Sequence, residues 1–226
     1  MKNLCIIPAR GGSKRIPRKN IKPFMGKPIL AYSIEAALKS NLFDEVMVST
    51  DDEEIASIAL SYGAKVPFMR SARTSNDHAG LADVIDEVLY QYSEIGQQFN
   101  NWCCILSTAP FVTDSLISSS YNEFINNGFD TLRPIVKFSY PIQRAFTMKE
   151  NGKVSFMYPE YSQTRSQDLE IAYHDAGLFY WGTVAKGFKG NVWGGFEIDE
   201  NYCQDIDTES DWIIAEIKYK ALYNLL

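Results

Sequence analysis

The sequence contains little histidine or cysteine and has no long apolar run. Its 226 residues include two histidines, His78 and His174, and four cysteines, no two of which are spaced as Cys-x-x-Cys. This set excludes a histidine-rich metal cluster and disfavours a zinc site or a disulfide framework. No apolar run approaches the roughly 18 to 20 residues that span a bilayer. We therefore expect a cytoplasmic protein with no membrane partner, in which Cys5, Cys103 and Cys104 are buried thiols.

Acidic residues are absent from the first 34 positions, which contain eight lysines and arginines. The other 192 residues hold 14 basic and 28 acidic residues, so the chain as a whole has a net charge of −6. A negative total argues against nucleic acid as a partner. The local positive excess at the N-terminus therefore needs a separate explanation.

Short apolar runs alternate with helical patterns through the first ~135 residues. Runs typical of strands cover residues 4–8, 45–49 and 103–106, and residues 66–69 and 131–136 are expected to be extended. Apolar spacings typical of helices cover residues 28–38, 51–59, 81–92 and 113–124. This alternation predicts an α/β fold with a doubly wound, mostly parallel sheet.

Residues 138–172 break the alternation with turns and aromatic side chains. We predict a single domain over residues 1–226 with an insertion at about 138–172, which could make dimer contacts. Strands are expected again at 177–181 and 195–198. A last helix should begin near Thr208, where Thr208-x-x-Asp211 resembles a capping box with Asp in the usual Glu/Gln place. Its predicted apolar face consists of Ile213, Ile214, Ile217, Ala221 and Leu225.

A basic, glycine-containing loop follows the first predicted strand. Residues 7–20 read Ile-Pro-Ala-Arg-Gly-Gly-Ser-Lys-Arg-Ile-Pro-Arg-Lys-Asn. Ligands of open α/β sheets bind beyond the carboxyl ends of strands, and paired glycines let backbone N–H groups approach an anion. The spacing fits neither a Walker A loop nor Gly-x-Gly-x-x-Gly. We predict a polyphosphate-binding loop, and a solvated surface loop is the alternative.

Two carboxylates, Asp205 and Asp207, are separated by one residue. In an extended segment, residues i and i+2 point to the same side. Two carboxylates so placed can bind Mg²⁺ together with the phosphates of a substrate. The alternative role, stabilisation of a helix N-terminus by Asp207 beside Thr208, is compatible with the first.

These motifs resemble those of the CMP-sialic acid synthetase family, the cytidylyltransferases of acidic keto-sugars. The resemblance covers nearly the whole chain and rests on the loop at 7–20 and on residues 49–51, 70–77, 164–169 and 205–207. Two departures stand in the family's Arg-Pro-x-x-Leu-Ser-x-Asp element, where Ser71 replaces proline and Thr74 replaces leucine.

Within the family, residues 107–111, 140–145 and 174–177 look most like the branch that acts on pseudaminic acid. Leu106 and Ser107 stand where sialic acid enzymes have Gln-Pro, and Leu178 stands where a glutamine is expected. The departure at 106–107 moves the expected substrate away from ordinary sialic acid. Sibling enzymes for sialic, legionaminic or 3-deoxy-octulosonic acid, and a non-catalytic nucleotide-binding protein, remain alternatives.

The resemblance implies a Rossmann-like nucleotidyltransferase, a homodimer that uses CTP and Mg²⁺ to activate an acidic nine-carbon keto-sugar and releases pyrophosphate. The nucleotide-binding residues that it implies are Ala9, Arg10, Gly11, Gly12, Ser13, Lys14, Asn20 and Arg70. The implied catalytic residues are Arg10, Lys19 and Asp207, and the implied metal ligands are Asp205 and Asp207. The implied sugar-binding residues are Gln143, Arg144, Arg165, Gln167 and His174. Surface salt bridging remains an alternative for Arg144, and a structural role for His174.

Overall fold

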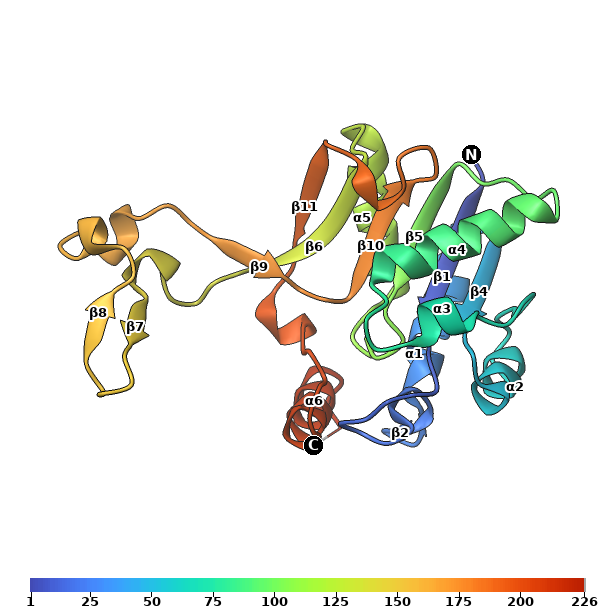
Figure 1. Cartoon of the computed structure of the whole chain (residues 1–226), viewed down its shortest axis with the longest axis horizontal. Coiled ribbons are helices and arrows are strands. Elements are labelled where there is room, and N and C mark those ends of the chain that lie inside the picture. The colour runs from blue at the N-terminus through green and yellow to red at the C-terminus, as the bar shows by residue number, and fades with distance from the viewer. Residues whose placement is uncertain (226) are drawn as a thin grey trace.

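A computed structural model describes residues 1–225 and places them around one mixed seven-stranded sheet (Figure 1). The strand order is β11-β6-β10-β5-β1-β4, and β9 also pairs with β6. The strands of this sheet are β1 (Asn3–Pro8), β4 (Glu45–Ser49), β5 (Asn101–Ile105), β6 (Thr131–Lys137), β9 (Tyr173–Asp175), β10 (Phe179–Thr183) and β11 (Trp193–Glu197). The helices are α1 (Ile29–Ser40), α2 (Glu53–Ser61), α3 (Ala72–Ser75), α4 (Leu81–Glu94), α5 (Asp114–Asn126) and α6 (Glu209–Leu222).

Smaller elements complete the described chain. Two short antiparallel pairs are formed by β2 (Pro23–Phe24) with β3 (Lys27–Pro28) and by β7 (Phe146–Met148) with β8 (Val154–Phe156). Single 3₁₀ turns cover Lys19–Ile21, Ile142–Arg144, Pro159–Tyr161, Ser166–Asp168, Gly187–Lys189 and Glu200–Tyr202. No helix within residues 1–225 is both long enough and apolar enough to cross a membrane.

Five strands of the main sheet run in one direction and two run against it. β1 is parallel to both β4 and β5, with Cys5 level with Val46 and Cys103. β10 lies antiparallel between β5 and β6, β9 is antiparallel to β6, and β11 is parallel to β6. The prediction of a mostly parallel sheet is confirmed. The reversed direction of β10 was not predicted from the sequence pattern.

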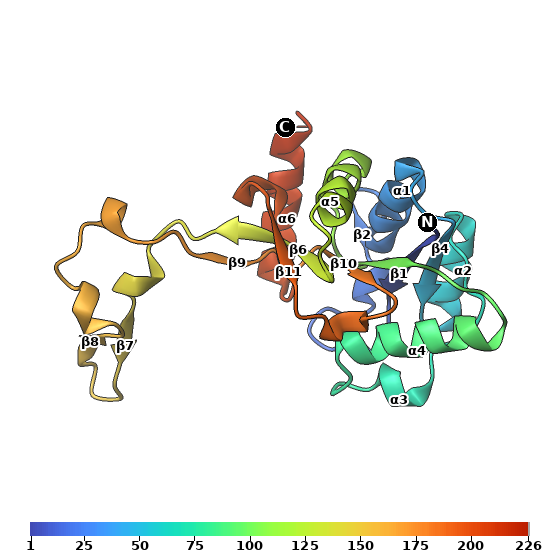
Figure 2. The ribbon, with the colours of Figure 1, turned by 90° about the horizontal axis from the view of Figure 1, so that it is seen from above.

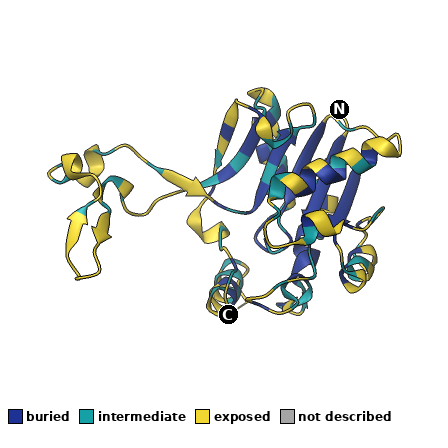
Figure 3. Cartoon of the chain, viewed as in Figure 1, coloured by how far each residue is buried: buried dark blue, intermediate teal, exposed yellow. Residues whose placement is uncertain are grey.

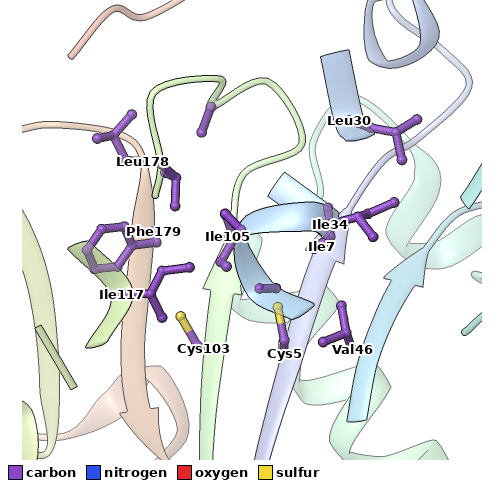
Figure 4. Packing of buried hydrophobic residues seen from close by; sticks show 14 of the residues in the cluster. Cys5, Ile7, Leu30, Ile34, Val46, Cys103, Ile105, Ile117, Leu178 and Phe179 are labelled. Atoms are coloured by element: carbon purple, nitrogen blue, oxygen red, sulfur yellow. The ribbon is translucent and has the colours of Figure 1, made fainter. Parts of the chain in front are cut away.

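Helices cover both faces of the sheet, as the doubly wound prediction requires (Figure 2). Successive residues of a strand point to opposite faces, so Cys5 and Ile7 pack toward α1 whereas Leu4 and Ile6 pack toward α4. Figure 4 shows the first of these layers, in which strand side chains meet residues from α1 and α5. Cys103 and Cys104 are fully buried free thiols, like Cys5, and burial raises the pKa of all three. The prediction of buried thiols is confirmed.

Residues 138–172, which we call the arm, extend away from the sheet (Figures 1 and 2). The arm leaves the sheet after β6 and returns at β9, and its surface is almost entirely exposed (Figure 3). Its β7–β8 hairpin has two strands only, too few to bury a core of their own. Large apolar side chains, such as Tyr140 and Met148, are therefore left more than 70% exposed.

One local prediction was wrong, and one segment predicted to be extended does not join the sheet. Residues 66–69 form no ladder, because Lys65 makes a single bridge to Met47 and Pro67 has no N–H with which to continue it. The predicted apolar face of α6 points largely outward, since Ile213 and Ile217 are more than half exposed. Helix α6 instead packs through Trp212, Ala215, Tyr219 and Leu222, which follow a different line along the helix.

Candidate active site

A cavity of about 490 Å³ opens beyond the carboxyl ends of β1 and β5. The basic loop forms one wall, and residues between Arg70 and Val84 form another. The residues after β5, Leu106 to Thr108, also line the cavity. The position agrees with the rule that open α/β sheets bind ligands at this edge.

The cavity collects most of the predicted nucleotide-binding residues. Those that line it are Arg10, Ser13, Lys14, Asn20 and Arg70, together with the predicted catalytic Lys19. Ala9 differs, because its side chain is fully buried and its N–H donates to the Ser49 carbonyl at 2.9 Å. Gly12 is exposed, and a Cβ added there would meet no other atom within 4 Å.

Gly11 is required by its surroundings. A Cβ at this position would lie 2.8 Å from Asp52 Oδ2 and 3.0 Å from Asp52 Cβ. The Gly11 N–H donates to Asp51 Oδ1 at 2.9 Å. The backbone of the basic loop is therefore fixed against the acidic turn after β4 at a distance that only glycine allows.

Acidic side chains pair with the cations of the cavity. Asp77 accepts from Arg10 Nη1 at 2.8 Å and also from Lys14 Nζ. These contacts lower the pKa of Asp77. The carboxylate occupies a place between two cations, which is also where a phosphate group would be attracted.

Asn20 joins the basic loop to the turn after β5. Its Nδ2 donates to the Arg10 carbonyl at 2.8 Å, and its Oδ1 accepts from Ser107 Oγ at 2.9 Å. Asn20 and Ser107 are both buried. The amide therefore braces the cavity walls, whatever contacts it makes with a ligand.

Arg70 is a buried cation at the base of the cavity. Its Nε donates to Ser49 Oγ at 3.0 Å, its Nη2 donates to the Ser49 carbonyl, and the side chain is only slightly exposed. Burial lowers the pKa of Arg70, and the nearby Asp51 carboxylate partly offsets this effect. These hydrogen bonds hold the guanidinium in one orientation at the end of β4.

The predicted carboxylate pair meets the basic loop, although nearly 190 residues separate them in the sequence. Asp207 Oδ1 accepts from Arg15 Nη2 at 2.8 Å and lies 3.6 Å from Lys19 Nζ, which also donates to the Ile206 carbonyl at 2.7 Å. Partial burial, reinforced by the charge of Asp207, raises the pKa of Asp205. The two like charges therefore lie close enough to repel each other.

This donor set fits Mg²⁺. Within residues 1–225, no three His, Cys, Asp or Glu side chains gather as a metal-binding group. The chain thus offers the pair Asp205 and Asp207, and Mg²⁺ is commonly held by one or two carboxylates, substrate phosphates and water. A divalent cation would also offset the two causes that raise the pKa of Asp205, its burial first and the charge of Asp207 second.

The predicted sugar-binding residues lie elsewhere. Gln143 and Arg144 belong to one 3₁₀ turn of the arm. Gln167 belongs to another such turn, and Arg165 directly precedes it. Arg144 Nη1 contacts Ser166 Oγ at 3.4 Å, so the two turns lie side by side. His174 is exposed on β9, at the base of the arm. None of these five residues lines the cavity of its own chain.

Three residues at the cavity were missing from the predicted site. Asp77 and Arg15 make the ion pairs described above, and Ser107 braces Asn20. A signal existed for Ser107, which directly follows a predicted strand at the ligand-binding edge. The pairing of Arg15 with Asp207 could not be predicted, because it depends on how the C-terminal segment crosses the loop.

Comparison with known proteins assigns the family. A family model described as "Cytidylyltransferase" matches residues 4–223. The chain belongs to the cytidylyltransferase family. It is therefore an enzyme of nucleotidyl transfer, as the motifs predicted.

Comparisons with individual proteins agree with this family assignment. A pseudaminic acid cytidylyltransferase of Campylobacter jejuni is 46% identical over 227 residues, which cover 98% of this chain and 97% of the relative. The N-acylneuraminate cytidylyltransferase A of Danio rerio is 34% identical over 93% of this chain and 49% of its own length. Among solved structures, a CMP:2-keto-3-deoxy-manno-octonic acid synthetase complexed with CTP has a TM-score of 0.70 at 17% identity, covering 99% of this chain and 100% of that chain. The last comparison supports the fold alone.

Proposed function

We propose that this cytidylyltransferase activates pseudaminic acid, an acidic nine-carbon keto-sugar, by transferring CMP to it from CTP with release of pyrophosphate. The observation that carries the proposal is the cavity, whose lysine Lys19 also contacts the carboxylate pair at Asp207. The relative that is 46% identical over almost the whole chain supports the choice of sugar. We expect the reaction to take place in the cytoplasm.

In this proposal the chain works by positioning and by electrostatic stabilisation. The exposed backbone at Gly12, with Ser13 and the cations Arg10 and Lys14, would hold the triphosphate. Ala9 and Gly11, whose N–H groups donate to Ser49 and Asp51, would fix the shape of the loop around it. Asn20 and Arg70 would place the ribose and the base. The anomeric hydroxyl of the sugar would attack the α-phosphorus in line, and Lys19 and Arg10 would neutralise the charge that develops.

Asp205 and Asp207 would hold Mg²⁺. When bound, the metal would supply Lewis-acid stabilisation to the phosphate oxygens. Lys19 and Arg15 would keep Asp207 oriented, through the contacts already described.

We further propose that two copies of the chain form a homodimer in which the arm serves the partner's cavity. Gln143, Arg144, Arg165 and Gln167 lie in or next to two turns of the arm, and several large apolar side chains of the arm are exposed. The arm lies far from the chain's own α3 and α4 (Figure 1). Arginine binds carboxylates in a bidentate fashion, which suits the acid group of the sugar. His174, at the base of the arm, would complete this sugar site.

The decisive test is pyrophosphate release with CTP, Mg²⁺ and a panel of acidic sugars. Release with pseudaminic acid supports the proposal. Release only with sialic, legionaminic or 3-deoxy-octulosonic acid would identify a sibling enzyme. CTP binding without release for any sugar would indicate a non-catalytic nucleotide-binding protein. Light scattering would test the dimer, and a monomer at assay concentration would refute it.

A further inference from the structure

Glu87 on α4 is a buried carboxylate that the proposed reaction does not use. Only 6% of its surface is exposed. Its Oε1 accepts from the Ser71 backbone N–H at 2.8 Å, and its Oε2 accepts from Ser71 Oγ at 2.7 Å and from Thr74 Oγ1 at 2.7 Å. A buried carboxylate is tolerated when its oxygens are hydrogen-bonded in this way.

The residues that Glu87 holds are continuous with a wall of the cavity. Ser71 directly follows Arg70, and Thr74 itself lines the cavity. Between them begins α3, a helix of four residues. Such a helix is too short to be stable alone, so it depends on contacts with its neighbour α4, and the contacts of Glu87 are of this kind.

Ser71 and Thr74 share one acceptor, although Ser71 precedes α3 and Thr74 lies within it. Both hydroxyls converge on the one carboxylate of Glu87. These hydroxyls and the carboxylate therefore form a polar clamp between α3 and α4.

The far end of this wall, at Asp77, is held by ion pairs and not by Glu87. Asp77 contacts Arg10 and Lys14, the cations expected to bind the triphosphate. A triphosphate on these cations would compete with Asp77 and release that end of the segment. The Glu87 clamp lies deeper and involves no residue expected to touch phosphate, so it would persist when nucleotide binds.

We propose that Glu87 is a positioning residue for the nucleotide: it holds segment 70–77 in place through Ser71 and Thr74 while the triphosphate displaces Asp77. This inference rests on the proposed use of CTP. It predicts that loss of the clamp weakens CTP binding and affects the sugar little.

The test is the dissociation constant of Mg-CTP, measured by titration calorimetry without sugar. Glu87→Ala should weaken binding about tenfold, because it removes several charge-assisted hydrogen bonds. Thr74→Val, which keeps the shape of the side chain, should weaken binding less. In the Glu87→Ala background, Thr74→Val should have almost no further effect, because the shared interaction is already lost. In turnover, KM for CTP should rise while KM for the sugar stays within about twofold.

Glu45 provides the matched control. It is also buried, and it accepts from Tyr92 Oη and from Lys65 Nζ at 2.9 Å, but it lies at the amino end of β4, away from the cavity. Glu45→Ala should lower the unfolding temperature and leave CTP affinity unchanged. Equal CTP affinity in wild type and Glu87→Ala, or equal weakening in Glu45→Ala, would overturn the positioning role. A wild-type chain that binds no CTP would instead overturn the proposed function.

Discussion

Asp52 joins the basic loop to α2 through an ion pair with Arg18. The contribution of this pair to the stability of the fold can be predicted from the pKa of Asp52. Its Oδ1 accepts from the Ile55 N–H at 3.0 Å, which caps α2, and from Arg18 Nη2 at 3.0 Å. Arg18 Nη1 contacts the other oxygen. The hydrogen bond from Arg18 is the main cause that lowers the pKa of Asp52 from its ordinary 3.8 to about 2. A change of this size corresponds to about 2 kcal/mol of stability at neutral pH.

The perturbation is Asp52→Asn, which removes the charge and keeps a good helix cap. Because the pKa of Asp52 is lower in the folded chain, the stabilisation is complete above the ordinary value and is lost as the pH falls. Urea unfolding near neutral pH should therefore show the variant about 2 kcal/mol less stable than wild type. The difference should shrink between about pH 4 and pH 2.

Glu54 supplies the control, since it contacts the same Arg18 guanidinium but its side chain is 66% exposed. Glu54→Gln should cost well under about 1 kcal/mol, as exposed ion pairs do. The reasoning would be refuted by an Asp52→Asn effect that does not change with pH. An equal cost for Glu54→Gln would also refute it.

Three further predictions concern the acidic residues of the site. Asp207→Asn should lower Mg²⁺-dependent turnover by at least about a hundredfold while CTP still binds, and unchanged pyrophosphate release would exclude Asp207 as a metal ligand. Because the pKa of Asp205 is raised in the folded chain, its ionisation destabilises the fold as the pH rises above the ordinary 3.8. Metal-free Asp205→Asn should therefore melt at a higher temperature than wild type near neutral pH but not at acid pH, and melting curves at both pH values check this. Asp77→Asn should lower the KM for CTP by about two- to fivefold, because it frees two cations from a competing carboxylate; a higher KM would show that Asp77 itself contacts the nucleotide.

Much of the fold followed from the sequence, because the patterns were local and strong. The apolar run at 45–49 became β4 with the same bounds, and the periodic segment from Leu81 became α4. The direction of β10 did not follow, because side-chain alternation is the same in parallel and antiparallel strands. The face of α6 was assigned wrongly because its aromatic residues, rather than its isoleucines, met a partner in the core.

The parts of the site that lie within one short segment of the sequence could be predicted. The basic loop reaches the cavity, as its position after a strand suggested, and Arg70 reaches it as the family resemblance implied. Contacts such as Arg15 with Asp207 join segments that are distant in the sequence, and no local pattern encodes them. The roles of the arm residues Arg144 and Arg165 stay predictions, because neither residue lines the cavity.

The excess of positive charge in the first 34 residues is balanced by carboxylates within the folded chain. Seven of its eight basic side chains form ion pairs with acids from other segments: Arg10, Lys14, Arg15, Arg18, Lys19, Lys22 and Lys27. A triphosphate would thus enter by ion exchange, replacing carboxylates rather than meeting bare cations. Added salt weakens the new contacts between the cations and the triphosphate, and it equally weakens the contacts with carboxylates that the triphosphate replaces. Nucleotide affinity should therefore depend only weakly on ionic strength, unlike that of an open cationic cleft.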